Sequence, residues 1–529
     1  MSDPTHLISK RAAGRTSVHF TNAPSDKPPA NFKPHEKPLA LSYGMPNHGF
    51  FPIDSIDVNL VDYPFQKITT PSTTSSTAEE EPPSSSLNGS ENGHQTKTPP
   101  SSIHTPQSTV HISRHTTDPK LIDLARGLQY AAVEGHAPLL QFARDFIIRT
   151  HKPNYDDWNV FITTGASDGL NKAADVFLDD GDVILVEEFT FSPFLRFSDN
   201  AGAKAVPVKI NFDNDSDGID LTQFVDLLEN WEKHYPNLPK PKALYTIATG
   251  QNPTGFTQSL EFRKKIYDLA VKYDFAIIED DPYGYLTLPK YEKPNIGGSG
   301  SGNNELKNDL EIDDYLKNHL TPSYLELDTT GRVLRVETFS KLFAPGLRLG
   351  FIVGHKEVID AVKNYSDVVN RGASGLTQTI VNNVIQENFK GVDGWLEWIL
   401  KMRLNYSYRK DLLLYSIFES QAYKKGYVDV IDPKAGMFVT FKINLPKDVD
   451  VLQKMKLLLW KLISYGILVV PGYNMTVDLE FSKDRSNFFR LCYALANNDE
   501  EILESGKRLT DAVYEFFSNG LEFHHHHHH

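Results

Sequence analysis

Cysteine, positive charge and long apolar runs are scarce in this sequence. Cys492 is the one cysteine in 529 residues, so no disulfide can form within the chain and no cysteine cluster can bind a metal. Such cysteine usage is typical of a reducing compartment, and we expect a cytoplasmic location. No run of about 18 apolar residues occurs, so we expect no membrane-spanning helix. The formal net charge of −14 repels phosphate backbones and argues against nucleic acid as a partner.

The remaining composition is typical of a soluble globular protein. Hydrophobic residues make up 40% and charged residues 23% of the chain, which is ample for a sizeable core. The chain ends in six histidines, and we interpret residues 521–529 as an expression tag. The rest of the length suits a large domain with a smaller one.

Two segments differ from the rest in composition. Residues 69–118 are rich in Ser, Thr, Pro and Glu and have almost no apolar side chains. Such a segment buries too little apolar surface to offset the entropy of ordering, so we predict a disordered insertion. Residues 291–330 contain a Gly, Ser and Asn run followed by a charged stretch, and we predict a second insertion at the surface.

Short apolar runs alternate with amphipathic stretches through the middle of the chain. We expect strands at 160–162, 183–186, 243–247, 275–278, 333–336 and 351–353, and a helix at about 259–272. Buried runs that alternate with helices predict an α/β fold with a mostly parallel sheet covered on both faces. After about residue 376 the pattern becomes helical, and strands return at 436–439 and 467–470.

This change of pattern predicts a division of the chain. We expect an N-terminal segment at 1–68, a large domain at 119–375 and a smaller α+β C-terminal domain at 376–520.

A thirteen-residue motif at 338–350, TFSKLFAPGLRLG, follows one of the expected strands. Ligand sites in α/β folds lie at the carboxyl ends of strands. A lysine there, Lys341, can form a Schiff base with an aldehyde cofactor. The hydroxyls of Thr338 and Ser340 and the guanidinium of Arg348 can converge on a phosphate group. A lone Ser-Lys pair would indicate only a turn with Pro and Gly after it, but the full thirteen-residue pattern favours a functional site.

The motif resembles the lysine signature of the class I and II aminotransferases, which bind pyridoxal phosphate and have fold type I. Two further matches follow the family's order: the turn at 251–255, QNPTG, and DDPY at 280–283. The resemblance implies that Asn252 contacts the phenolic oxygen of the cofactor and lies near the substrate carboxylate. It implies that Asp280 pairs with the pyridine nitrogen and that Tyr283 contacts the phenolic oxygen. An alignment slip of one residue would exchange Asp280 for Asp281.

Three more matches complete the site that the resemblance implies. The segment at 164–167, TGAS, follows a strand and opens a helix, and free N–H groups at a helix N-terminus bind anions. The family binds the cofactor phosphate there, which implies Ala166 and Ser167. Phe191 matches the aromatic residue that stacks on the pyridine ring. Arg490 resembles the arginine that holds the substrate α-carboxylate by two contacts.

The resemblance continues on both sides of residues 69–118. The segment at 43–46, YGMP, resembles the N-terminal segment that closes over the substrate, which implies that Gly44 contacts substrate. Tyr130 matches the tyrosine that reaches the cofactor phosphate of the neighbouring subunit, which implies a homodimer with shared active sites. Leu128-Gln129-Tyr130 looks most like the fungal aromatic amino acid and 2-aminoadipate aminotransferases.

The resemblance implies an enzyme that moves an amino group from Phe, Tyr or Trp, with 2-aminoadipate as a further donor, to a 2-oxo acid such as 2-oxoglutarate. Lys341, Asp280 and Tyr283 are the expected catalytic residues, and no metal is expected. Two alternatives stay open. One is another pyridoxal phosphate reaction on the same fold, such as a β-lyase. The other is a transcription regulator with an aminotransferase-like domain. The negative net charge argues against this alternative, because a DNA-binding protein is expected to carry a basic surface.

Overall fold

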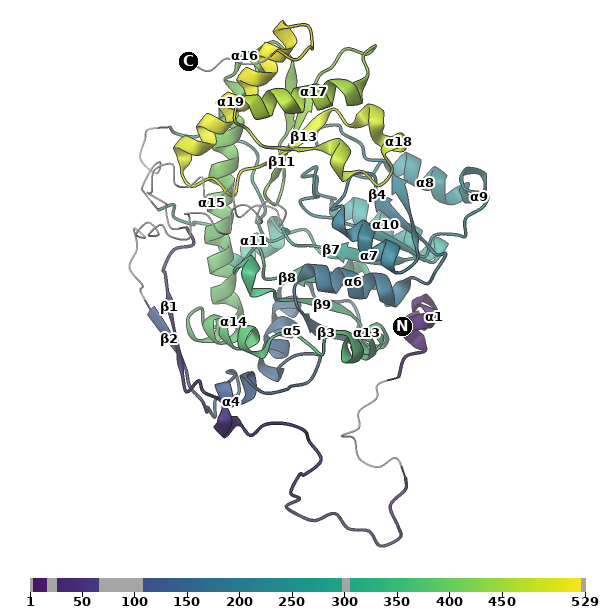
Figure 1. Ribbon diagram of the computed structural model, residues 1–529, viewed down its shortest axis with the longest axis vertical. Helices are drawn as coiled ribbons and strands as arrows, with labels where there is room; N and C mark the ends of the chain where they lie inside the picture. The colour runs from purple at the N-terminus through teal and green to yellow at the C-terminus, as the bar shows by residue number, and fades with distance from the viewer. Residues whose placement is uncertain (1–2, 17–25, 66–107, 297–304, 525–529) are drawn as a thin grey trace.

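A seven-stranded sheet forms the centre of the protein (Figure 1). The structure is a computed structural model and describes residues 3–16, 26–65, 108–296 and 305–524. The strands of this sheet are β3 (Trp158–Thr163), β4 (Val183–Glu187), β5 (Lys204–Val208), β6 (Ala243–Thr246), β7 (Ala276–Asp280), β8 (Val333–Thr338) and β9 (Gly350–His355). Their order is β3-β9-β8-β7-β6-β4-β5. β9 is antiparallel to both of its neighbours and the other pairs are parallel, so the predicted mostly parallel sheet is confirmed.

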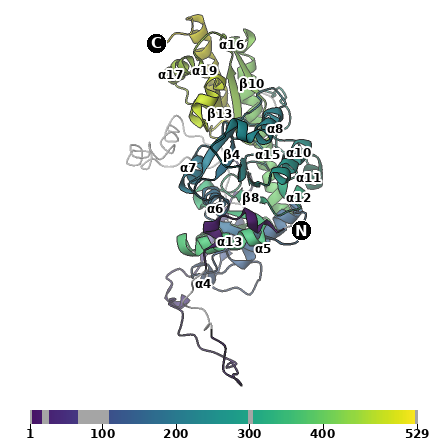
Figure 2. The ribbon, with the colours of Figure 1, turned by 90° about the vertical axis from the view of Figure 1, so that its right-hand side faces the viewer.

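Helices cover both faces of this sheet, as Figure 2 shows from the side. Because side chains alternate along a strand, Val183 and Leu185 face one layer while Ile184 and Val186 face the other. The first layer is formed by α5 (Ala137–His151), α8 (Leu221–Glu229) and α10 (Leu260–Tyr273). The second is formed by α6 (Ala166–Phe177), α7 (Pro193–Asn200) and α13 (Lys356–Val369).

Each expected strand of the large sheet has a counterpart in the structure, and the expected helix at 259–272 corresponds to α10. β5 was not expected from the sequence. It begins at an exposed lysine, Lys204, and contains Pro207, which cannot donate a ladder hydrogen bond. β5 lies at the edge of the sheet, where a strand tolerates proline.

A second sheet of four antiparallel strands lies toward the C-terminal end of the chain. Its strands, in the order β10-β11-β13-β12, are β10 (Val428–Ile431), β11 (Phe438–Ile443), β13 (Phe488–Cys492) and β12 (Val470–Pro471). Three helices pack with it: α15 (Val392–Phe418), α17 (Val451–Ser464) and α19 (Asp499–Ser518). The first half of α15 packs with the large sheet and its second half with the small one (Figure 1). The boundary expected at residue 375 stays a prediction.

The shorter elements complete the fold. The remaining α-helices are α14 (Gly375–Glu387) and the short α1 (Lys10–Ala13), α4 (Leu124–Gly127), α9 (Trp231–His234), α11 (Ile312–Asn318), α12 (Tyr324–Leu327), α16 (Gln421–Lys424) and α18 (Leu479–Ser482). The 3-10 helices are η1 (Pro4–Leu7), η2 (His48–Phe50), η5 (Pro345–Leu347), η6 (Gly472–Met475) and η7 (Lys483–Arg485). In the ranges that the structure covers, no helix is both long and apolar enough to cross a membrane.

The structure differs from the expectation at the end of the first insertion. Residues 66–107 lie outside the described residues, but β2 (Ser108–Ile112) pairs with β1 (Ile56–Leu60) in an antiparallel ribbon. Val110 and Ile112 are buried and pack with Leu124, because alternate residues of β2 face the body of the protein. The predicted end of the insertion at Asp118 is therefore wrong.

The predicted bounds of the second insertion, 291–330, were also too wide. Residues 297–304 lie outside the described residues, but 312–328 contain α11 and α12. Tyr315, Tyr324 and Leu325 are fully buried in the core of the large sheet. These aromatic and apolar side chains lie close to a charged stretch in the sequence. The charged stretch favoured a surface location, so their place in the core was not predicted.

Candidate active site

One edge of the large sheet gathers the residues that the sequence singled out. β4, β6, β7 and β8 are parallel, so their carboxyl ends meet at this edge. β3 ends at the same edge, because Thr163 and Thr338 both pair with Gly350 at the start of β9. The loops that follow these strands therefore converge, although they are up to about 180 residues apart in the chain.

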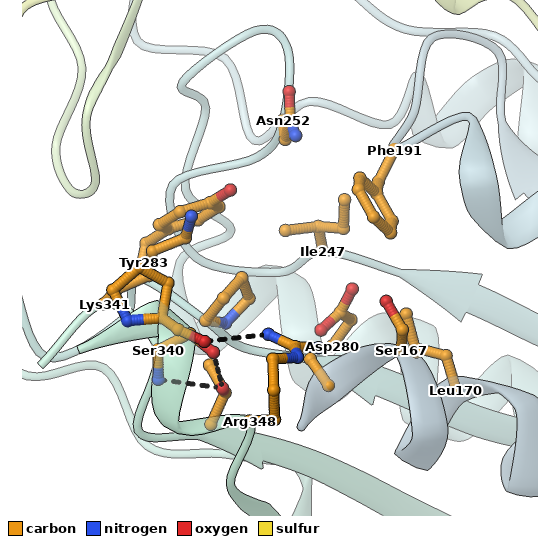
Figure 3. Close-up of a pocket in the computed structure, with 14 residues that line it drawn as sticks. Ser167, Leu170, Phe191, Ile247, Asn252, Asp280, Tyr283, Ser340, Lys341 and Arg348 are labelled. Carbon is orange, nitrogen blue, oxygen red and sulfur yellow. Dashed lines mark hydrogen bonds between the residues drawn. The ribbon is translucent and has the colours of Figure 1, made fainter. Parts of the chain in front are cut away.

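These loops surround a cavity of about 160 Å³ (Figure 3). Ten of the predicted site residues line it: Ala166, Ser167, Phe191, Asn252, Asp280, Tyr283, Thr338, Ser340, Lys341 and Arg348. Leu170, Ile247, Pro282 and Pro345 complete the lining. In Figure 3, Lys341 and Tyr283 lie on one side of the cavity, and Phe191 and Ile247 lie across from them.

Lys341 follows the last residues of β8 in a tight turn. Burial lowers the pKa of its amine below the ordinary value of a lysine. The positive charges of Arg490 and Arg348 act in the same direction, and Cys492 opposes them. A lysine whose pKa is lowered has a larger fraction of its amine in the neutral form, which is the form that attacks an aldehyde and accepts a proton.

Asp280 ends β7 and is buried. Its Oδ2 accepts a hydrogen bond from the hydroxyl of Tyr245 at 2.6 Å, whereas its Oδ1 is buried and has no hydrogen-bond partner among the described residues. Burial raises the pKa of Asp280 to about 7; the hydrogen bond from Tyr245 lowers it and the charge of Asp281 raises it. A buried oxygen without a partner costs free energy unless a ligand supplies a donor.

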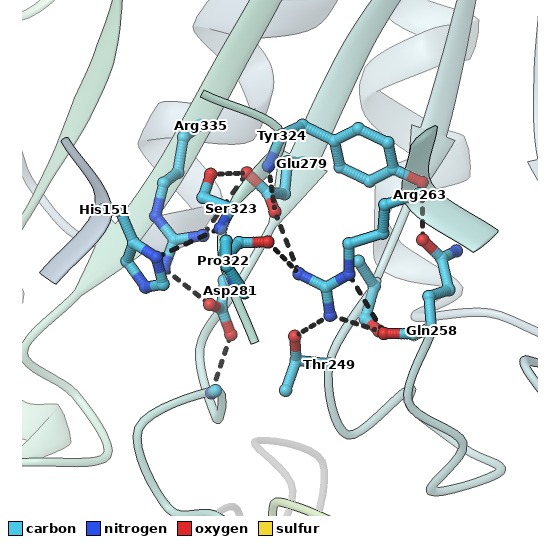
Figure 4. Close-up of polar contacts among 12 residues, drawn as sticks. His151, Thr249, Gln258, Arg263, Glu279, Asp281, Pro322, Ser323, Tyr324 and Arg335 are labelled. Atoms are coloured by element: carbon cyan, nitrogen blue, oxygen red, sulfur yellow. Dashed lines mark hydrogen bonds and ion pairs between the residues drawn. The ribbon is translucent and has the colours of Figure 1, made fainter. Parts of the chain in front are cut away.

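Asp281, the alternative to Asp280, does not line the cavity. Its Oδ1 accepts the backbone N–H of Gly284 at 2.6 Å, and its Oδ2 accepts from Arg335 at 2.5 Å. Figure 4 shows this buried network, in which Arg335 of β8 also lies 3.3 Å from Glu279 of β7. Arg335 thereby links β8 to the end of β7. Removing either partner would leave a buried charge uncompensated. The ends of β7 and β8 carry Asp280 and Lys341.

The part of the cavity beside the start of α6 suits an anion. Gly165 precedes α6 with no side-chain cap, so the first N–H groups of this helix are left for another acceptor. A Cβ at Gly165 would lie 2.8 Å from Nη2 of Arg348, and this glycine has a φ of +110°. Only glycine therefore permits the close approach of Arg348 to the helix. Ser340 adds a hydroxyl, which Thr338 holds by donating a hydrogen bond at 2.9 Å.

Arg490 comes from the small sheet and does not line the cavity itself, but it contacts Asn252, which does. It lies on β13, and its Nη1 donates to Oδ1 of Asn252 at 3.0 Å. Its guanidinium lies 4.2 Å from the centre of the Phe438 ring, and its buried Nε has no hydrogen-bond partner within the described chain. The arrangement leaves donors of a planar cation free to bind a carboxylate at two points.

Comparisons with known proteins agree with this geometry. Residues 115–505, more than half of the chain, match the family model described as aminotransferase class I and II. The chain belongs to this family. Class I and II aminotransferases depend on pyridoxal phosphate, so the cavity can be tested against that cofactor.

Individual relatives cover from about three quarters to almost all of the chain. The aromatic amino acid aminotransferase 2 of Saccharomyces cerevisiae is 36% identical over 91% of this chain and 91% of its own. A crystal structure of the aromatic aminotransferase Aro9 from C. albicans is 89% identical, covers 99% of this chain and 100% of that chain, and has a TM-score of 0.87. The L-tyrosine:2-oxoglutarate aminotransferase atrD of Tapinella panuoides is 28% identical over 78% of this chain and 83% of its own.

The residues of this aminotransferase fit pyridoxal phosphate. The partnerless Oδ1 of Asp280 can accept from a protonated ring nitrogen, and Lys341 has the amine that an aldehyde needs. The uncapped start of α6, together with Arg348, can hold the phosphate. Phe191 gives an aromatic face at the cavity wall.

Gly44 and Tyr130 do not line the cavity of their own chain. Both are exposed, and residues 26–47 project away from the body in Figure 1. The expected closure of the N-terminal segment over the site is therefore not met within the single chain. The two predicted elements nevertheless lie side by side, because Gln129 donates to the carbonyl of Pro46 at 2.6 Å.

Tyr245 is the residue that the sequence analysis missed. It lies in β6 within the run ALYT, where an aromatic residue indicates only core packing. One signal was present: a buried phenol requires a hydrogen-bond partner, so a tyrosine in a fully buried strand indicates a polar neighbour. The sequence does not identify that neighbour, because Asp280 is 35 residues away.

Proposed function

We propose that this aminotransferase moves the amino group of Phe, Tyr or Trp to 2-oxoglutarate in two half-reactions at one site. The observation that carries the proposal is the convergence on one cavity of the amine of Lys341, the carboxylate of Asp280 with its partnerless oxygen, and the guanidinium of Arg348. The donor range follows the printed names of relatives that cover almost the whole chain. The acceptor follows the name of the Tapinella relative.

Each residue has a stated task in this proposal. Lys341 attaches the cofactor covalently, and its amine moves the proton of the substrate Cα once it is released. Asp280 Oδ1 keeps the ring nitrogen protonated. When bound, pyridoxal phosphate supplies an electron sink for the charge left at the substrate Cα. Arg490 and Asn252 orient the substrate by its α-carboxylate, supported by their 3.0 Å hydrogen bond.

Tyr283, Thr338, Ser340 and Phe191 complete the site in this proposal. Burial raises the pKa of the Tyr283 phenol, so this residue stays protonated and donates a hydrogen bond to the phenolic oxygen of the cofactor. Ala166, Ser167, Ser340 and Arg348 hold the phosphate, with Thr338 orienting Ser340. Phe191 stacks on the ring.

The proposal includes a second copy of the chain. Tyr130 and Gly44 are exposed and lie outside the cavity of their own chain, and Tyr130 lines a surface hollow with Pro46 of the N-terminal segment. This is the arrangement expected of residues that complete the partner's site. We propose a homodimer in which Tyr130 reaches the phosphate bound by the partner subunit. We also propose that the enzyme acts in the cytoplasm, in keeping with its single cysteine.

An amino-donor screen tests the activity. With 2-oxoglutarate as acceptor, aromatic donors should give the highest kcat/KM, and glutamate should form in amounts equal to the 2-oxo acid released. A donor preference for aspartate or alanine would contradict the aromatic assignment. Pyruvate and ammonia in place of glutamate would indicate a lyase.

Lysine attachment tests the site. Borohydride should fix the cofactor to a peptide that contains Lys341, and Lys341→Ala should lower turnover by roughly three or more orders of magnitude because the nucleophile and the proton carrier are the same group. The exposed Lys356→Ala is the matched control and should keep full activity. Labelling at another lysine would overturn the assignment.

A further inference from the structure

Asp280 is held from behind by one side chain. The Tyr245 hydroxyl donates to Oδ2 of Asp280 at 2.6 Å, and both residues are fully buried. The two residues lie on adjacent parallel strands, since Tyr245 of β6 pairs with Ile278 of β7. Asp280, which lines the cavity, therefore has one carboxylate oxygen bonded to the protein and one, Oδ1, without a hydrogen-bond partner among the described residues.

The Tyr245 ring also has a fixed position. It stacks on Phe194 with the ring centroids 3.8 Å apart and an angle of 11° between the planes. Phe194 lies in the first turn of α7, and its backbone N–H donates to the carbonyl of Phe191 at 3.0 Å. Tyr245 thus contacts both the acidic side chain at the base of the cavity and the turn that carries the aromatic wall.

The choice of a phenol has a chemical consequence. Burial and the neighbouring charge of Asp280 raise the pKa of Tyr245 well above its ordinary value, so Tyr245 is a donor that does not give up its proton. A neutral donor stabilises the ionised carboxylate without competing with a cationic ligand for its charge. A lysine or arginine at this position would instead satisfy the charge of Asp280 inside the protein.

We propose that Tyr245 is a positioning residue that orients the Asp280 carboxylate and keeps its Oδ1 available for the protonated ring nitrogen of the cofactor. This inference rests on the proposed function, because it requires Asp280 to bind that nitrogen. Tyr245 does not line the cavity, so it acts through Asp280 and not by its own contact with substrate or cofactor.

A double-mutant cycle on cofactor affinity tests this inference. In Tyr245→Phe, which keeps the ring and its stacking, the Kd for pyridoxal phosphate should rise about 10-fold to 100-fold, as expected for losing a hydrogen bond to a charged group. kcat should fall while the KM for the amino donor stays unchanged. Tyr245→Phe in the Asp280→Asn background should change the Kd by less than about twofold, because coupled residues are not additive.

Tyr267→Phe is the matched control. Tyr267 donates at 2.8 Å to another buried aspartate, Asp328, away from the cavity, and its loss should leave the cofactor Kd unchanged. Far-ultraviolet circular dichroism checks that each variant is folded.

The outcomes separate the inference from the proposed function. If Asp280→Asn alone leaves the Kd unchanged, the proposed role of Asp280 is wrong. If Asp280→Asn weakens binding but Tyr245→Phe does not, the inference about Tyr245 is wrong. An equal loss from Tyr245→Phe in both backgrounds would show a packing role for the hydroxyl and would also overturn the inference.

Discussion

At the scale of single residues, the site contains a carboxylate whose burial costs free energy, and a bound ligand would lower that cost. Asp280 lies between Tyr245 and the cavity, and burial is the largest cause of its raised pKa of about 7. An ionised carboxylate with one partnerless oxygen in a buried position is costly. A bound cation at Oδ1 would lower that cost, which couples cofactor binding to the charge of Asp280.

This coupling predicts a pH dependence for the cofactor-free protein. Because the folded pKa of Asp280 is above its unfolded value, the native state holds a proton that the unfolded state has released, so stability falls as pH rises from about 4 to about 7. Asp280→Asn removes this cost. The variant should be more stable than wild type at pH 8, by on the order of a few kcal/mol, and similar at pH 4. Urea unfolding at both pH values measures the difference.

Asp123 gives the control of opposite sign. Burial raises its pKa, but hydrogen bonds from Thr116 and Arg126 outweigh burial and leave the pKa lowered. Its contribution to stability is present above the unfolded pKa and is lost as pH falls. Asp123→Asn should therefore destabilise the protein at pH 8 and have little effect at low pH. An Asp280→Asn variant that behaved in the same way would contradict the assignment.

At the scale of elements, the ribbon of β1 and β2 connects two parts of the chain that are distant in sequence. Leu60 and Ser108 are paired at one end of the ribbon. Val110 and Ile112 face a small apolar cluster with Leu124, and Leu376 and Ile380 of α14 pack against it. The ribbon therefore belongs to the folded body, and a loop closed between its strands can be short.

Two deletions separate the ribbon from the segment between its strands. Replacing residues 69–105 with a short Gly/Ser linker should leave the Tm within a few degrees and activity within a few-fold, because every residue of β1 and β2 is kept. Replacing 69–118 should lower the Tm clearly, because it removes two buried side chains at roughly 1.5–3 kcal/mol each. Equal Tm values for the two variants would show that β2 adds no stability.

At the scale of the whole molecule, the single chain holds most but not all of the expected site. Ten predicted residues line the cavity, whereas Tyr130 is 71% exposed beside Pro46 of the N-terminal segment. Apolar side chains on that segment, among them Leu39 and Leu41, are almost fully exposed. Exposed apolar residues grouped in this way favour contact with another copy of the chain.

Subunit mixing tests whether the active sites are shared. Lys341→Ala inactivates its own site, and Tyr130→Asp places a negative charge where a phosphate is expected, so each homodimer should be nearly inactive. In a hybrid with shared sites, both defects fall in one site and the other is intact. Random exchange of equal amounts should then restore about a quarter of wild-type activity.

The exposed aromatic Trp460 on α17 provides the comparison, since Trp460→Asp alone should stay active. If exchange is confirmed by mass spectrometry and no activity returns, Tyr130 does not serve the partner subunit.

The sequence by itself determined which side chains meet in the cavity. Most of the predicted residues that line the cavity lie at or soon after a strand end, and parallel strands bring their carboxyl ends to one edge whatever their separation along the chain. The position after a strand was enough to single out Lys341 and the start of α6, whereas Asp280 and Asn252 were identified through the resemblance to the aminotransferase motifs. The sequence left Asp281 as an alternative to Asp280, and the structure separated them, because Asp280 lines the cavity whereas Asp281 points into the buried network with Arg335.

Tertiary structure decided what depends on contacts between distant segments. The sequence pattern predicts only core packing for Tyr245. Its hydroxyl binds Asp280 because β6 lies beside β7. Tyr315 and Tyr324 follow a polar loop and are buried because α11 and α12 pack into the core of the large sheet. β2 ends a Ser- and Thr-rich segment and is ordered because β1 pairs with it. Composition and period describe a residue's own neighbourhood, whereas burial and hydrogen bonding depend on which partner the fold brings to it.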